Sequence, residues 1–307
     1  MPKLFLLCLF ALCLLPLSLQ AETLKTVITV DRDVFEDSRR FLNGRDALSI
    51  TDFSTSFARR DVVDFILIQQ AVALGGIKLQ VRYEPGNYDA RNLRSISSGM
   101  LLIGLDTFWL AELEKLQDTL YISDPLIRKG EYIAGIYTSP QNTHALSLTS
   151  LAQLSQLSAV SSSHWHAAWA TWQKIGPKRL LDESSWPSQA KLVSRRWVDV
   201  MLSPFLPKMP FKIQTEEYHL VAIPGVKVAL YDSRHVAVSR SHPDGERVFN
   251  ALQQGLKLLR QQGRIRRAYT EAGFFHPQVD SWILLNPLPD EASSSTQSGC
   301  GNAAACR

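Results

Sequence analysis

The sequence has few cysteines, and none of them falls in its long central part. The 307 residues contain four, at Cys8 and Cys13 near the start and at Cys300 and Cys306 near the end. A disulfide framework through the central part is therefore excluded. Cys300 and Cys306 could close only a small loop in an oxidising compartment.

Charge of one sign is not concentrated either. The chain carries 33 basic and 29 acidic residues, a formal net charge of +4. Basic pairs such as Arg39-Arg40, Arg59-Arg60 and Arg195-Arg196 are scattered among acidic residues. Because a nucleic-acid footprint needs clustered positive charge, we interpret each pair as a solvated face and predict no nucleic-acid partner.

Several catalytic and metal-binding patterns are missing. The sequence has no Gly-x-Ser-x-Gly, no phosphate-binding glycine loop and no His-Glu-x-x-His. His164 and His166 are two residues apart and so point to different sides of a helix, and neither cysteines nor an acidic pair lies near them. We expect no metal and no cofactor.

The start of the chain is typical of an export signal. Lys3 precedes an apolar run over residues 4–19, and Ala21 is a small residue suited to cleavage. The run is shorter than the roughly 20 residues of a spanning helix. We expect residues 1–21 to be a signal peptide and the mature protein to be periplasmic, with no stable membrane insertion. An uncleaved anchor is the alternative.

The rest of the chain alternates strand and helix patterns, which predicts an α/β fold. Strands are expected over residues 24–30, 77–83 and 100–105, with a helix over 53–74 between the first two. A turn and strand over 121–137 form a crossing point. A second α/β unit follows, with a strand before residues 161–163 and helices over 164–174 and from about 188 past 200. Strands over 226–230 and 235–239 and a helix from Asp244 to Gly263 then lead back.

These elements predict two lobes. The expected boundaries are residues 22–125 for the first part of lobe 1, 126–234 for lobe 2 and 235–289 for the return to lobe 1. Residues 290–307 are rich in Ser, Ala and Gly, which predicts a disordered tail.

Three polar positions stand out for binding. Asp31 follows the first strand, where ligands of α/β sheets often bind, although a solvated loop is as good an interpretation. Ser162 and Ser163 precede a helix, where they either cap it or hold an anionic group. Asp199 stands between apolar neighbours, so it needs a structural partner or a ligand.

The order of these pieces resembles the periplasmic solute-binding proteins of the amino-acid type, the family 3 extracellular solute-binding proteins. The resemblance lies in the strand into Val30-Asp31, Ser98-Gly99 before an apolar run, Tyr121-Ile122-Ser123-Asp124-Pro125, Ala159 to Ser163, Trp197-Val198-Asp199-Val200, and Val236 to Arg240 before a helix ending at Gly263. It implies a type II periplasmic-binding fold: two α/β lobes, each a mixed sheet flanked by helices, joined by a hinge of two crossing segments.

The resemblance also implies a ligand site between the lobes. Asp31 and Asp199 would hold an ammonium group, and Ser163, with Ser162 and His164 beside it, would receive a carboxylate. Phe108 and Trp109 would line the pocket. The family's carboxylate-binding arginine is missing from residues 114–117, where Lys115 is only a point charge. Arg128 or another basic group would have to replace it, unless the ligand has no α-carboxylate or binding has been lost.

Three functions fit these observations. The leading one is non-catalytic capture of a small polar solute by lobe closure for an ABC transporter or a membrane sensor, by a protein we expect to be monomeric. The first alternative is an interaction module that no longer binds a ligand. The second is an exported dehydratase or hydrolase on the same scaffold, with Asp31, Glu114, His164 and Asp199 as its acid and base candidates.

Overall fold

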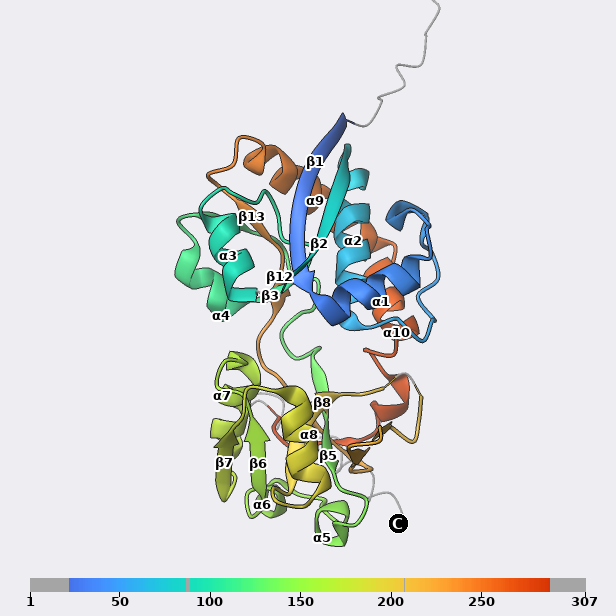
Figure 1. Ribbon diagram of the computed structural model, residues 1–307, viewed down its shortest axis with the longest axis vertical. Coiled ribbons are helices and arrows are strands. Elements are labelled where there is room, and N and C mark those ends of the chain that lie inside the picture. The colour runs from blue at the N-terminus through green and yellow to red at the C-terminus, as the bar shows by residue number, and fades with distance from the viewer. Residues whose placement is uncertain (1–21, 87–88, 207, 288–307) are drawn as a thin grey trace, which may run out of the picture.

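The computed structural model describes residues 22–86, 89–206 and 208–287. Within these ranges the chain folds into two bodies, one above the other in Figure 1. The predicted signal peptide, the predicted tail from residue 290 and all four cysteines lie outside the described residues. None of the helices in the described ranges is long and apolar enough to cross a membrane.

Lobe 1, the upper body in Figure 1, is built from the first part of the chain and a later return. Its elements are β1 (Glu22–Asp31), α1 (Arg32–Leu42), η1 (Ala47–Ser49), α2 (Arg60–Leu74), β2 (Ile77–Gly86), α3 (Asp89–Ser97), β3 (Phe108–Trp109), α4 (Leu110–Leu113), η2 (Glu114–Leu116), β4 (Leu120–Ile122), β12 (Arg234–His235), β13 (Ala237–Ser239), α9 (Gly245–Gln261) and α10 (Arg264–Glu271).

Lobe 2, the lower body, holds the middle of the chain and its described end. Its elements are β5 (Ile133–Thr138), α5 (Thr143–Leu146), α6 (Leu151–Leu154), β6 (Ser158–Ser161), α7 (His166–Ile175), β7 (Arg179–Asp182), α8 (Trp186–Ser194), β8 (Val200–Pro204), β9 (Lys212–Gln214), β10 (His219–Ala222), β11 (Val226–Ala229), η3 (Pro277–Val279) and β14 (Ile283–Leu284).

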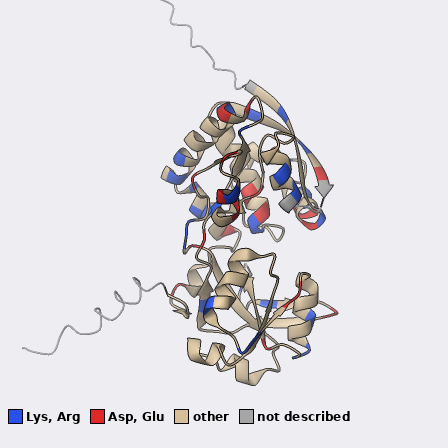
Figure 2. Ribbon diagram, turned by 90° about the vertical axis from the view of Figure 1, so that its left-hand side faces the viewer, with Lys and Arg blue, Asp and Glu red and all other residues tan. Residues whose placement is uncertain are grey.

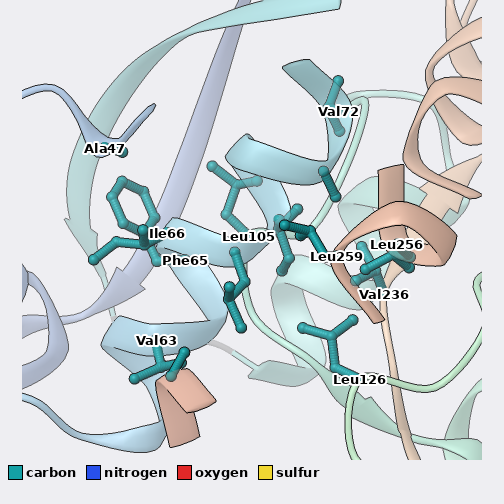
Figure 3. Packing of buried hydrophobic residues seen from close by; sticks show 14 of the residues in the cluster. Ala47, Val63, Phe65, Ile66, Val72, Leu105, Leu126, Val236, Leu256 and Leu259 are labelled. Atoms are coloured by element: carbon teal, nitrogen blue, oxygen red, sulfur yellow. The ribbon is translucent and has the colours of Figure 1, made fainter. Parts of the chain in front are cut away.

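The core of lobe 1 forms where α2 packs against α9. Residues 62–72 of α2 are all buried, as expected of a helix that is apolar on nearly every side. Glycines allow the two backbones to approach, because a Cβ at Gly255 would lie 1.8 Å from the carbonyl oxygen of Ala71. Leu256 and Leu259 of α9 lie in the same apolar cluster as Val63 and Ile66 of α2 (Figure 3).

The strands of lobe 1 are less continuous than the sequence predicts. β1 and β2 pair in parallel, whereas β3 pairs with β12 and β4 with β13 in antiparallel fashion. The prediction of a strand over residues 100–105 is wrong: this run forms only an isolated bridge, from Ile103 to Val238. Its hydrogen bonds are irregular, because Leu101 N–H still bonds to the carbonyl of Ser95 in the preceding helix.

Lobe 2 has one mixed sheet, with strand order β14-β11-β5-β8-β6-β7 and with β10 and β9 branching from β5. The predicted long helix from about residue 188 past 200 is wrong in its second half. α8 ends at Ser194, Arg196 adopts a left-handed φ of 61°, and residues 200–204 form β8. Trp197, expected on the buried face of that helix, is 67% exposed.

The described end of the chain also differs from the predicted return. β14 pairs with β11 in the sheet of lobe 2, so the residues after α10 leave lobe 1 again. The chain therefore crosses between the lobes three times, after β4, after β11 and after α10, where two crossings were expected. The third crossing exists because Val226 and Lys227 offer β14 an edge for parallel pairing.

Candidate functional site

Strand directions identify the ends of the two lobes that face each other. In lobe 1 the parallel strands β1 and β2 run toward lobe 2, and α2 begins at that end (Figure 1). In lobe 2, β6 runs toward lobe 1 and is followed by α7. Ligands of α/β sheets bind beyond the carboxyl ends of the strands. The space between the lobes is therefore the candidate site.

One electrostatic effect spans this space. Burial raises the pKa of Glu112 in α4, and the charge of His166 in α7 offsets this increase only in part. Glu112 belongs to lobe 1 and His166 to lobe 2, so these two helices are near enough to act on each other. Charged residues gather in lobe 1, including near its end toward lobe 2, whereas most of lobe 2 is uncharged (Figure 2).

A network of buried charged residues lies at the end of lobe 1 that faces lobe 2. Arg60, the first residue of α2, donates through Nη1 to Asp64 at 2.5 Å, to Asp106 at 3.0 Å and to Thr107 Oγ1 at 3.1 Å. Asp64 is fully buried and also accepts from Thr107 Oγ1 at 2.6 Å and from the hydroxyl of Tyr269. The network joins α2, the segment before β3 and α10.

Three carboxylates of this network lie close enough to suggest a metal site. Oxygens of Asp61, Asp64 and Asp106 are within 4.8 Å of one another. Arg60 contacts all three of them, however, donating to Asp61 through Nη2. The guanidinium of Arg60 therefore supplies the positive charge that a metal ion would bring.

Arg234 is the second arginine of this region, and it is 8% exposed. Its Nε donates to Thr107 Oγ1 at 2.8 Å, and its Nη2 donates to the carbonyl of Thr107. The guanidinium lies 4.7 Å from the ring centroid of Trp109, which in turn packs on Tyr132 at 5.1 Å. Its Nη1 makes no hydrogen bond with the described residues, so one face of the fork is available.

The two arginines are compensated to different degrees. For Arg60, burial lowers the pKa, but the charges of Asp106 and Asp64 outweigh burial and the pKa is raised. For Arg234, burial and the positive charge of Arg60 prevail over the same carboxylates, and the pKa is lowered. The carboxylates near Arg234 therefore do not fully compensate its buried positive charge. An anionic group placed there would be stabilised.

The structure puts the predicted serines at the facing end of lobe 2, but most of their polar groups are already bonded. Ser162 is fully buried, and its Oγ accepts from the backbone N–H of His164 at 3.2 Å. The N–H of Ser163 donates to Asp182 at 2.9 Å. α7 begins only at His166, so an anion at this place would compete with Asp182.

Asp199 lies at the wrong end of lobe 2 for the predicted ligand contact. Its carboxylate accepts from Ser158 N–H at 2.9 Å, from Ser158 Oγ at 2.6 Å and from Asn142 at 3.2 Å. Ser158 is the first residue of β6, so this bond network fixes the strand's amino end, away from lobe 1. Burial raises the pKa of Asp199, but the hydrogen bonds from Ser158 outweigh it and the pKa is lowered. Asp199 is a structural residue.

The other predicted residues are spread between core and surface. Phe108 is 6% exposed and packs in an apolar cluster with Ile96 and Leu113, so it belongs to the core. Arg128 is exposed in the first crossing segment. Asp31 ends β1 at the facing end of lobe 1, but its side chain lies outside the described residues. Among the predicted pocket residues whose side chains the structure describes, Trp109 is the one that contacts Arg234.

Sequence reasoning missed Arg60, Asp106, Thr107 and Arg234. A signal existed for one pair, because Asp106-Thr107 directly follows the apolar run of residues 100–105. Arg60 belongs to one of the scattered basic pairs that are typical of a solvated face, and Arg234 lies between the two strands predicted over residues 226–230 and 235–239. Nothing local distinguishes a buried arginine from an exposed one.

Comparison with known proteins gives a likeness in three dimensions only. No protein-family model and no curated protein matches the sequence. The YckB protein of Bacillus subtilis has a similar structure, with 13% identity over 82% of this chain and 90% of its own and a TM-score of 0.50. An ancestral cationic amino acid solute-binding protein is similar with 16% identity over 84% of this chain and 97% of its own, at a TM-score of 0.50. The chain thus has the two-lobed α/β fold of the type II solute-binding proteins.

Proposed function

We propose that this protein captures a small, amino-acid-like solute between its two lobes, without catalysis, and delivers it to an ABC permease or a membrane sensor. The observation that carries the proposal is Arg234, a buried guanidinium at the facing end of lobe 1 with one nitrogen that bonds to no described residue. It would replace the carboxylate-binding arginine that is missing from residues 114–117.

The charges near Arg234 favour a solute with both signs of charge. Arg234 has a lowered pKa and would gain from a carboxylate, whereas Glu112 has a raised pKa and would gain from an ammonium group. Arg234 is among the charges that act on Glu112, so the two are neighbours. A zwitterionic solute would satisfy both at once, with the ring of Trp109 beside it.

The same arrangement supports capture by lobe closure. The lobe 2 side contributes α7, whose first residue, His166, already acts on Glu112. Movement of α7 toward α4 would exclude water from the solute and strengthen every charge contact in the site. Ser163 and His164, at the turn before α7, would then contact the solute from lobe 2.

Compartment and partners follow from the same proposal. We infer that residues 1–21 direct export and are removed, so that the mature protein acts in the periplasm as a monomer. An amino-acid-binding neighbour of the same fold, the ancestral cationic amino acid solute-binding protein, supports this type of solute.

A thermal-shift screen of the protein from residue 22 onward against the amino acids and related amines tests the proposal, because a bound solute raises the melting temperature by mass action. Hits are then titrated by calorimetry against Arg234→Lys and, as a control, Arg240→Lys. Arg240 also stacks on an aromatic ring, 4.1 Å from the centroid of Tyr121, but bonds the carbonyl of Leu120 instead of facing lobe 2.

We expect Arg234→Lys to weaken binding by at least about tenfold, because lysine is a point charge and cannot reproduce the fork. Arg240→Lys should bind like the unaltered protein. A flat screen would contradict solute capture and favour the interaction module. Equal affinities in both variants would refute the role of Arg234.

A further inference from the structure

We propose that lobe 1 has a second ligand site, separate from the space between the lobes, which binds a small aromatic carboxylate carrying a hydroxyl or ring N–H. The site is a cavity of about 540 Å³ between α1, the η1 turn, α2 and β2. This volume is within the range of about 300–1,000 Å³ that small-molecule sites occupy. None of Arg60, Asp106, Trp109 and Arg234 lines it, so it does not depend on the proposed solute site.

The walls of the cavity are aromatic and aliphatic. Phe35 of α1 stacks on Tyr83 of β2 with ring centroids 4.6 Å apart, and Phe65 of α2 meets the same tyrosine edge-on at 5.1 Å. Leu79 and Leu42 complete the apolar surface. An aromatic ring inserted here would contact the existing aromatic groups in offset or edge-on geometry, which is the favoured arrangement.

Two buried polar side chains line the cavity with unused hydrogen-bonding capacity. Gln69 is 8% exposed; its amide nitrogen donates to the carbonyl of Phe65, and its amide oxygen accepts no hydrogen bond from a described residue. Ser38 is 2% exposed, and its hydroxyl accepts from Tyr83 at 3.2 Å, which leaves its own hydrogen to donate. Gln69 lines the cavity, so its amide oxygen is placed to accept a hydrogen bond from a ligand O–H or N–H.

The rim carries a net positive charge. Lys78 is paired with Asp46 at 3.3 Å, but Arg39 is exposed and its side chain makes no ion pair or hydrogen bond with the described residues. Arg39, Lys78 and Asp46 all line the cavity, which gives it an excess of one positive charge. Burial raises the pKa of Tyr83 to about 12, so its phenol adds no negative charge near neutral pH. These charges favour an anionic end on the ligand.

The probes are 4-hydroxyphenylacetate and phenylacetate, which differ only in the hydroxyl expected to reach Gln69. Binding is measured by calorimetry and by displacement of 8-anilinonaphthalene-1-sulfonate, an aromatic anion that fluoresces in apolar sites. Arg39→Glu tests the rim charge. Arg40→Glu is its matched control, because Arg40 is the adjacent exposed arginine of α1 and does not line the cavity.

We expect saturable binding of 4-hydroxyphenylacetate at one site, weakened on the order of tenfold by Arg39→Glu and unchanged by Arg40→Glu. Gln69→Met, which keeps the side-chain length, should reduce its affinity to that of phenylacetate. Failure of both acids to bind saturably, or equal effects of the two charge reversals, would overturn the proposal. Arg234→Lys separates the two sites, because it should leave this binding unchanged, and a parallel loss there would assign the acids to the space between the lobes.

Discussion

Replacing Asp64 with alanine should destabilise the protein more than any substitution of a surface charge. Asp64 is fully buried and accepts from Arg60, Thr107 and Tyr269. Alanine would leave three donors without this acceptor, and it would leave the guanidinium of Arg60, whose side chain is 15% exposed, with fewer counter-charges. Breaking a buried pair from one side costs about 3–5 kcal/mol.

Unfolding in guanidinium chloride, followed by circular dichroism, measures this loss. With a slope of about 4–6 kcal/mol/M, a loss of about 3–5 kcal/mol moves the midpoint down by about 0.5–1.3 M. Glu217→Ala is the control, because Glu217 pairs with Lys191 at a comparable 2.7 Å but is 62% exposed. An exposed pair contributes at most about 1 kcal/mol. Similar midpoint shifts in the two variants would refute the argument that burial makes the network's contribution to the free energy of unfolding large.

Three further predictions test packing, pH dependence and the structural role assigned above. Gly255→Ala should lower the unfolding free energy by about 1–3 kcal/mol, because its Cβ would meet the Ala71 carbonyl; an unchanged denaturation midpoint would contradict this. His235 is buried and its pKa is lowered chiefly by burial, so its contribution to stability is present above about pH 6.5 and is lost as the pH falls through the folded-state pKa. Midpoints at pH 7.5 and 5.5 should therefore differ more in the unaltered protein than in His235→Gln. Asp199→Ala should lower the melting temperature, because it removes the hydrogen bonds with Ser158, but should leave solute affinity unchanged. A loss of affinity in calorimetry would instead show that Asp199 contacts the solute.

The elements that the sequence predicts well are those whose pattern follows from one buried face. α9 begins and ends within two residues of its predicted bounds, because apolar residues recur at helical spacing from Val248 to Leu259 and bury one side. β6 is expected before the serines and is found there. In both cases the local pattern and the tertiary packing agree.

The errors arise where partners distant in the sequence decide the structure. The apolar run of residues 100–105 has the composition of a strand, yet only its bridge to Val238 pairs regularly. α1 was not predicted, because Ser38 and Phe41 are its only buried members in a highly charged stretch. The contact between Arg234 and Thr107 spans 127 residues. No local pattern encodes which arginine a fold will bury.

Two consecutive residues of β12, Arg234 and His235, bond to the first crossing segment. The backbone N–H of Arg234 donates to the carbonyl of Ile127 at 2.8 Å, and the ring of His235 donates to the carbonyl of Ser123 at 2.6 Å. Both acceptors belong to the first crossing segment, so β12, which directly follows the second crossing, is bonded to the first crossing at Arg234 and His235. A solute held by Arg234 is thereby attached to the backbone about which the lobes would rotate. Closure would then change the position of α7 relative to the solute while leaving Arg234 fixed to lobe 1, and binding energy gained from α7 in the closed state would favour closure directly.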